Sequence, residues 1–116
     1  MPGMLSKIHR LNKKKDFDNI FQQGDLAQDS FLAVRFLPNQ KETSRFGLVV
    51  RAKTAPKATD RNRLKRQLRE VIRRHLKKIK TGIDFVLVVK AKLAGADYNS
   101  IEAALLNLLE KKKLYV

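Results

Sequence analysis

The sequence predicts an α+β fold whose elements follow one another as helix, strand, strand, helix, strand, helix. Three observations carry this prediction. Apolar residues recur at helical spacing in 12–23, in 60–80 and in a stretch that starts near residue 99. Residues 31–37 and 45–51 are β-prone and are separated by a polar connection of hairpin length. Residues 83–90 are almost continuously apolar, as in a central strand that is buried on both faces.

The chain has the size and apolar content of one domain with a single core. It contains 116 residues, of which 43% are hydrophobic. We therefore expect residues 1–116 to form a single domain. Residues 1–10 are basic and lack a period, so we expect them to be mobile or to become ordered on a partner.

The first predicted helix, residues 12–23, places Phe17, Ile20 and Phe21 on one face, and Gly24 follows where a helix C′ residue is expected. Phenylalanines in so short a helix are either core anchors or rings that stay partly exposed and stack on a nucleobase. The pattern leaves both interpretations open.

The second predicted strand, residues 45–51, has one apolar face and one mixed face. Phe46, Leu48 and Val50 alternate on the first, while the second combines glycine, valine and arginine. The mixed face predicts a side of the sheet that is not wholly covered. A loop with Pro56 and with two lysines, Lys53 and Lys57, then leads into the second helix.

The second helix, predicted for residues 60–80, is the most informative part of the chain. Its predicted buried face consists of Leu64, Leu68, Val71, Ile72, Leu76 and Ile79. The opposite side carries a stripe that we call the basic stripe, made of Asn62, Lys65, Arg66, Arg69 and Arg73. Glu70 is expected to point to its flank, which would leave the cations without a neutralising carboxylate.

Helix caps and the last helix follow from short patterns. Thr59 or Asp60 is expected to cap the basic helix, and Asn99 with Glu102 is expected to form a capping box at the start of the last helix. The buried stripe predicted for that last helix is Ile101, Ala104, Leu105, Leu108 and Leu109. Lys111, Lys112 and Lys113 suit its negative C-terminal end.

The positive charge predicts a polyanionic partner. The formal net charge is +15, and so much self-repulsion is usually tolerated for the sake of such a partner. Charge alone does not separate RNA, DNA and an anionic membrane surface. Most charged helix faces are merely solvated, but those usually mix signs, whereas the basic stripe does not. This difference favours a nucleic-acid surface.

Several classes of function are excluded or disfavoured. No apolar run is long enough to span a membrane, and the N-terminus lacks a signal-peptide segment. The chain has no cysteine, so a cytoplasmic protein fits best. His75 falls among apolar positions and His9 has no evident carboxylate partner, so we predict neither a catalytic residue nor a protein metal site. The chain is therefore expected to bind rather than to cleave.

Residues 61–70 and their flanks resemble the signature of the bacterial ribonuclease P protein subunit. The resemblance rests on Arg61-Asn62-Arg63, Lys65-Arg66 and Arg69-Glu70, which follow the Phe46-Gly47-Leu48-Val49-Val50 strand. Residues 11–24, the strand 84–88 and the leucine-rich end extend it over nearly the whole chain.

This resemblance implies a fold and a function. The implied fold is a small α/β sandwich of the kind seen in domain 2 of ribosomal protein S5, with a left-handed crossover through the basic helix; general handedness rules alone would favour a right-handed one. The implied activity is endonucleolytic removal of the 5′ leader of precursor tRNA by a ribonucleoprotein. A catalytic RNA subunit cleaves the bond with Mg²⁺ held mainly by RNA phosphates, and the protein assists.

The resemblance also implies site residues. The RNA-binding set, completed by Arg73 from the basic stripe, is Lys53, Arg61, Asn62, Arg63, Lys65, Arg66, Arg69 and Arg73. The set expected to line a cleft for the leader is Phe17, Phe21 and Val34. The chain departs from the family pattern at Ala52, where a lysine is frequent, at Val34, where some members have an aromatic residue, and in 54–59, which lack glycine.

Two other functions remain as alternatives. A structural RNA-binding protein, such as a ribosomal protein, would need the same basic surface without a catalytic partner. A DNA regulator is disfavoured, because residues 61–80 are too evenly basic to read base edges selectively and no helix-turn-helix pair is evident.

Overall fold

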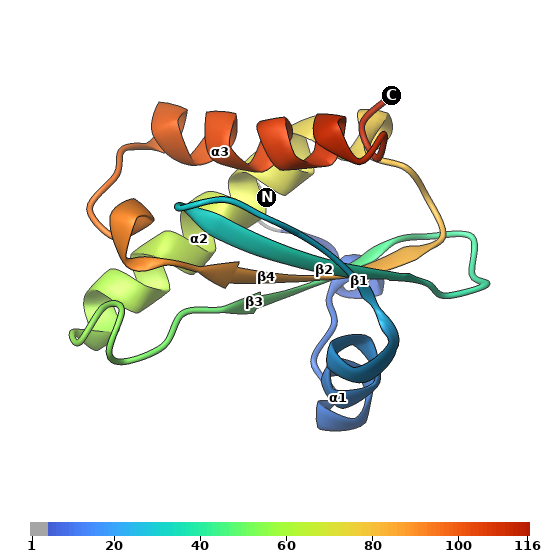
Figure 1. The fold of residues 1–116 in the computed structure, drawn as a ribbon, viewed down its shortest axis with the longest axis horizontal. Helices are drawn as coiled ribbons and strands as arrows, with labels where there is room; N and C mark the ends of the chain where they lie inside the picture. Colours follow the sequence, from blue (N-terminus) through green and yellow to red (C-terminus); the bar gives the residue numbers. More distant parts are fainter. Residues whose placement is uncertain (1–4) are drawn as a thin grey trace.

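A computed structural model describes residues 5–116, in which four strands form one sheet with helices on both of its faces (Figure 1). The elements are α1 (Lys14–Gln23), β1 (Asp25–Gln28), β2 (Leu32–Pro38), β3 (Arg45–Val49), α2 (Ala58–His75), β4 (Ile83–Val89) and α3 (Tyr98–Lys111). Single 3₁₀ turns lie at η1 (Lys7–His9), η2 (Leu76–Lys78) and η3 (Ala91–Leu93). The α+β class and the predicted order are confirmed, with one strand added.

The added strand is β1, which sequence reasoning missed. It has four residues, of which Asp25 and Gln28 are exposed, so neither its length nor its composition distinguishes it from a loop. It pairs antiparallel with β2, with Leu26 opposite Arg35 and Gln28 opposite Ala33. β1 therefore widens the sheet beside α1.

The strand order is β1-β2-β4-β3, which makes β4 a central strand as predicted. β2 is antiparallel to β4, whereas β3 is parallel to β4 and is joined to it through α2. A parallel pair needs such a crossover, because the chain must return to the end of the sheet at which the first of the two strands began. The carboxyl ends of β3 and β4 consequently lie side by side at the same end of the sheet.

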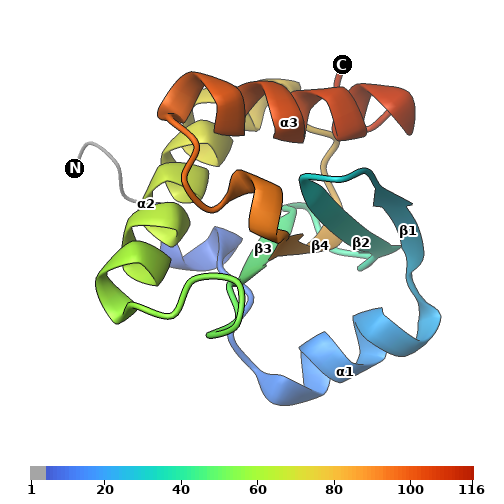
Figure 2. The ribbon, with the colours of Figure 1, turned by 60° about the vertical axis from the view of Figure 1, so that its left-hand side comes forward.

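Alternation along the strands divides the core into two layers. Leu32, Val34, Phe36, Phe46, Phe85 and Leu87 lie on the side covered by α2 and α3, and there the rings of Phe46 and Phe85 stack with centroids 5.0 Å apart. Leu11, Ile20 and Val86 form a smaller cluster on the side of α1. Figure 2 shows α1 alone on its face, opposite the α2 and α3 layer. The α1 face is thus only partly covered.

The helix caps differ from those predicted. α2 begins at Ala58, and Lys57 at its N-cap makes no side-chain capping bond. α3 is capped by Asp97, whose carboxylate accepts a hydrogen bond from the Ser100 N–H, and this bond lowers the pKa of Asp97. The predicted capping box at Asn99 is therefore wrong. The Glu102 carboxylate instead lies 2.7 Å from His75 Nε2, at hydrogen-bond distance, and so joins α3 to α2.

The segment before α1 lies against the sheet. The expectation of a mobile start covered residues 1–10, of which residues 1–4 lie outside the described part of the chain. Leu5 is 3% exposed, and Arg10 forms a parallel bridge with Phe46. His9 Nδ1 lies 2.8 Å from the backbone oxygen of Ser44. These contacts place residues 5–10 beside β3 and the start of α1.

Arg45 in β3 links a buried carboxylate of β4 to a partly exposed carboxylate of α1. Asp84 in β4 is 6% exposed and accepts two hydrogen bonds from Arg45 in β3, at 2.9 and 2.6 Å. The hydrogen bond to Asp84 raises the pKa of Arg45 above its ordinary value, against the opposing effect of burial. Arg45 also lies 3.5 Å from the carboxylate of Asp16 in α1. The pair therefore helps to fix how α1 sits over the sheet.

Gly24 ends α1 as expected, but for a different reason. Its φ of −78° and ψ of 155° are extended rather than left-handed. A Cβ at this position would lie 2.6 Å from the Ile20 carbonyl oxygen and 3.0 Å from that of Phe36, both backbone atoms that cannot rotate away. Glycine is thus required because the last turn of α1 and the backbone of β2 both lie too close for a Cβ.

We predict that Gly24→Ala destabilises the protein by about 1–3 kcal/mol, the usual cost of overpacking. Gly95→Ala is the matched control, because a Cβ there meets no atom within 4 Å; its effect should lie within about 1 kcal/mol of zero. Urea unfolding followed by circular dichroism measures both. Equal stabilities for the two variants would contradict the close approach.

Candidate nucleic-acid interface

The basic stripe of α2 faces outward because the opposite face is fully buried. Leu64, Leu68, Val71 and Ile72 are each 0% exposed. On the other side Asn62, Arg66 and Arg73 are exposed, and Lys65 and Arg69 are half-buried. The helix thus presents these cations on a rigid support.

Glu70 neutralises part of this surface, contrary to the expectation. Arg73 donates from Nε and Nη2 to the two oxygens of Glu70 at 3.1 and 2.7 Å, and Arg74 Nε lies 3.5 Å from the same carboxylate. Position 70 is three residues before Arg73, which is close enough for a side-chain pair on a helix. Within residues 5–116, Lys65 and Arg66 form no ion pair with any carboxylate.

The side chains of Arg61 and Arg63 both donate hydrogen bonds to backbone carbonyl groups of neighbouring loops. Arg61 Nη1 donates to the carbonyl oxygens of Ala55 and Pro56, at 2.9 and 2.8 Å. Arg63 donates to the carbonyl of Ala94 at 3.1 Å and to Gln67 at 3.0 Å. These two arginines therefore fix the segments on either side of the N-terminal half of α2, in addition to any contact with RNA.

A hollow lies between α1, β3 and α2. It is lined by Leu5, Arg10, Leu11, Asn12, Phe17, Phe46, Leu48 and Arg69. Burial, and then the positive charge of Arg10, lower the pKa of Arg69 from its ordinary value. Two arginines that face one hollow without a lining carboxylate favour an anion there.

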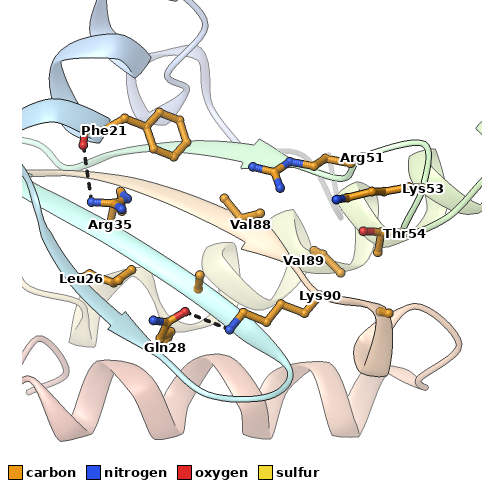
Figure 3. Close-up of a pocket in the computed structure, with 12 residues that line it drawn as sticks. Phe21, Leu26, Gln28, Arg35, Arg51, Lys53, Thr54, Val88, Val89 and Lys90 are labelled. Atoms are coloured by element: carbon orange, nitrogen blue, oxygen red, sulfur yellow. Dashed lines mark hydrogen bonds between the residues drawn. The ribbon is translucent and has the colours of Figure 1, made fainter.

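A larger groove of about 650 Å³ lies on the α1 face of the sheet. Phe21 forms its wall on the side of α1, and Ala33 and Val88 lie on its floor. The other lining residues are Leu26, Gln28, Arg35, Arg51, Lys53, Thr54, Val89, Lys90 and Ala91 (Figure 3). Four of these residues are cations and none is a carboxylate.

The topology explains why these cations converge. Arg51 and Lys53 follow β3, and Lys90 follows β4, so the parallel pairing brings all three to the same edge of the sheet. Lys90 Nζ donates to Gln28 Oε1 at 2.9 Å and to the Asp29 carbonyl at 2.7 Å. Arg35 donates to the Phe21 carbonyl at 3.4 Å, and its guanidinium lies 5.7 Å from the centre of the Phe21 ring (Figure 3).

The structure separates the residues predicted to line one cleft. Phe21, which is 37% exposed, and Lys53 both line the groove, although Lys53 was grouped with the basic helix. Phe17 is half-buried and lines the neighbouring hollow, with its ring over Gly47. Val34 is 0% exposed in the core beneath α2 and α3, so its assignment to the cleft is wrong.

Sequence reasoning missed the groove cations Arg35, Arg51 and Lys90. A signal for Arg35 was present, because alternation in β2 puts residues 33 and 35 on the face opposite to residues 32 and 34. Which face carries the groove is decided by the position of α1, and that is not visible in the local pattern.

The remaining candidates behave as packing residues. His75 is half-buried and lies 2.8 Å from Tyr115 Oη and 2.7 Å from Glu102, as expected for a packed histidine. Within residues 5–116, no three histidine, aspartate or glutamate side chains are grouped as a metal site requires. None of the helices in the same range is both long enough and apolar enough to cross a membrane.

Comparisons with known proteins give a consistent result. A family model described as Ribonuclease P matches residues 5–113. The ribonuclease P protein component of Thermotoga sp. (strain RQ2) is 37% identical over 115 residues, which cover 96% of this chain and 97% of that protein. The one from Synechocystis sp. (strain ATCC 27184 / PCC 6803 / Kazusa) is 43% identical over 95 residues, covering 81% and 77% respectively.

Solved structures agree with these relatives. The ribonuclease P protein from Thermotoga maritima matches with a TM-score of 0.81 at 39% identity, covering 88% of this chain and 96% of that one. The protein from Staphylococcus aureus matches with a TM-score of 0.85 and covers 93% and 98%, but its identity of 24% supports the fold alone. With the family model spanning nearly all described residues, the chain belongs to the ribonuclease P protein family, the protein component of a ribonucleoprotein endoribonuclease that processes tRNA.

Proposed function

We propose that the protein binds the catalytic RNA of ribonuclease P through the basic stripe, and the 5′ leader of precursor tRNA through the groove on the α1 face. The observation that carries this division is the groove itself, with four cations, a partly exposed phenylalanine ring and no carboxylate along its lining. Single-stranded nucleic acid is commonly held by such a combination of positive charge and aromatic faces.

The two surfaces suit different forms of RNA. The basic stripe is a convex helix face, on which arginine can bind phosphate bidentately and lysine supplies a mobile charge. Asn62 can both donate and accept, and so can reach a ribose hydroxyl. The groove is concave, with Leu26, Ala33 and Val88 as apolar surface between its cations. It fits an extended strand with unstacked bases better than a duplex.

We assign the Mg²⁺ of the reaction to RNA phosphates. Mg²⁺ prefers carboxylate, phosphate and water oxygens. The residues that line the groove offer instead two arginines and two lysines, which would repel a divalent cation. The groove lining therefore does not fit a magnesium site, and its role is to bind and orient RNA. We place the reaction in the cytoplasm, which suits a chain without cysteine.

The direct test mixes the protein with the catalytic RNA and precursor tRNA at low magnesium. The proposal expects faster removal of the 5′ leader than with the RNA alone. Binding without acceleration would favour a purely structural RNA-binding protein, and the absence of binding would contradict both functions.

Arg66→Ala is expected to weaken binding of the catalytic RNA, because Arg66 is exposed and has no ion pair to a described carboxylate. The slope of log affinity against log salt concentration should fall by about 0.7–0.9 for each phosphate that the variant no longer neutralises. Lys14→Ala is the matched control, since it changes the net charge equally on a side chain that is 92% exposed in α1. An identical slope for both variants would remove Arg66 from the interface.

Phe21→Ala is expected to weaken binding of precursor tRNA about 5- to 150-fold, the effect of removing about 1–3 kcal/mol of stacking on one base. Binding of mature tRNA, which has no leader, should be unaffected. Phe31→Ala is the control, because Phe31 is 40% exposed and also lies beside a cation, Lys92, but lines a different hollow. If leader affinity falls equally in the two variants, the groove is not the leader site.

The protein is expected to lower the magnesium concentration that cleavage requires. Its net charge of +15 screens RNA phosphates that Mg²⁺ must otherwise neutralise. Cleavage rates measured over a magnesium titration, with and without saturating protein, check this expectation. Coincident midpoints would show that the protein acts on substrate binding alone.

A further inference from the structure

A second group of lysines gathers at the end of the molecule where α2 and α3 both terminate. We call it the lysine cluster, and it consists of Lys77, Lys78, Lys80, Lys111, Lys112 and Lys113. All six side chains are exposed. Within the described residues, none of them forms an ion pair with a carboxylate.

The backbone holds the two lysine-bearing segments side by side. Lys80 N–H donates to the Leu114 carbonyl at 2.8 Å, and Val116 N–H donates to the Lys78 carbonyl at 2.6 Å. Ile79 and Tyr115 form an antiparallel bridge between these bonds. Since paired Cα atoms lie about 5 Å apart and neighbouring ones 3.8 Å, the Cα atoms of Lys80 and Lys113 lie within about 9 Å of each other.

Buried side chains keep this arrangement rigid. Leu114 is 5% exposed and Ile79 is 3% exposed. Tyr115 Oη lies 2.8 Å from Nδ1 of His75, which is also bonded to Glu102 in α3. The lysine cluster is therefore presented on a fixed surface and not on a loose tail. Figure 1 shows the C-terminus at the end of α3, away from the loop between β3 and α2 that carries Lys53.

Lys113 occupies a position at which glycine is favoured. The Leu114 N–H donates to the Leu109 carbonyl at 2.7 Å and the Lys113 N–H to that of Glu110 at 3.0 Å, which together form a Schellman motif. In this motif the C′ residue is left-handed, and Lys113 accordingly has a φ of 59°. A side chain is strained there, so the presence of lysine is not explained by the needs of the helix end.

The helix dipoles do not account for the cluster either. Each helix C-terminus carries about half a negative elementary charge, and the two that end here therefore supply about one. Glu110 in the last turn of α3 adds one more. The six positive charges of the lysine cluster exceed this negative charge severalfold. Salt screens charges only beyond the Debye length of about 8–10 Å, so neighbouring lysines of the cluster repel one another.

We propose that the lysine cluster, which lies beyond the C-terminal end of the basic stripe and outside the groove lining, is an additional RNA-binding surface that binds the phosphate backbone without reading sequence. This inference rests on the proposed function, in that the polyanion is one of the RNAs of ribonuclease P. Lysine ammonium groups act as point charges toward phosphate and do not demand a particular base.

The test uses Lys113→Gly in the full-length protein. Relief of the left-handed strain should leave the melting temperature unchanged or raise it. Affinity for RNA should nevertheless fall two- to tenfold, and the salt slope should fall by about 0.7–0.9. Gln40→Gly is the matched control, because Gln40 is exposed, uncharged and has the same φ of 59°; its affinity should not change.

Two binding arms identify which RNA supplies the phosphates. One measures affinity of the free protein for the catalytic RNA, and the other measures affinity of the assembled complex for precursor tRNA. A decrease in either arm supports the proposal. The double variant Lys77→Gln/Lys78→Gln changes the segment that follows α2, whereas Lys113→Gly changes the segment that ends α3. It should weaken binding in the same assay as Lys113→Gly does.

The proposal is overturned if both lysine variants bind both RNAs as wild type does while Arg66→Ala binds more weakly. That outcome would leave the proposed function intact. If the wild-type protein binds neither RNA, the proposed function fails as well. Weaker binding of the lysine variants to anionic lipid vesicles, without any change toward RNA, would also overturn it.

Discussion

The burial of one face of α2 against the sheet and α3 is the interaction on which the remaining structure depends. Four apolar residues of this helix are completely buried, and the Phe46–Phe85 stack lies in the same core layer. Full burial of one such side chain contributes about 1.5–3 kcal/mol. This energy offsets the repulsion among the cations on the opposite face of the helix, and it fixes the direction in which they point.

The same helix creates the groove through topology. Because α2 returns the chain so that β4 runs parallel to β3, the ends of both strands lie at one edge of the sheet. The cations that follow those ends, Arg51, Lys53 and Lys90, therefore meet although they are distant in sequence. A single crossover thus supplies both a convex basic surface and a concave one, on opposite faces of one sheet.

Helical and strand periods predicted most of this architecture. Most of the buried face of α2, that of α3 and the central position of β4 follow from apolar spacing alone, because burial is what produces that spacing. The helix predicted for 60–80 ends at His75, however, so Leu76 and Ile79 lie beyond it, and Leu76 is only half-buried. β1 escaped prediction because an edge strand of four residues with polar ends has no period to read. The cap of α3 was wrong because Asp97 and Asn99 are both capping residue types and Asp97 makes the bond, whereas α2 begins at Ala58 without a side-chain capping bond.

The candidate site was less predictable than the fold. Family resemblance brought in Phe21 and Lys53, but it placed Val34 in the cleft when strand alternation puts it in the core. Arg73 was expected to be unpaired, yet a rotamer of Glu70 reaches it. The convergence of Arg35, Arg51 and Lys90 depends on sheet pairing. Pairing between strands that are distant in sequence cannot be read from the local sequence pattern, so the meeting of these three cations was not predicted.

Site-directed cross-linking can show whether the basic stripe contacts the catalytic RNA and the groove contacts the 5′ leader. The chain contains no cysteine, so a single introduced cysteine is the only site of attachment. A photoreactive group would be attached at Thr54→Cys in the groove lining, and separately at Asn62→Cys on the exposed side of α2. In the assembled complex, the account predicts that the first cross-links to the 5′ leader and the second to the catalytic RNA. Cross-links from both positions to the same RNA, or in the reverse order, would contradict it.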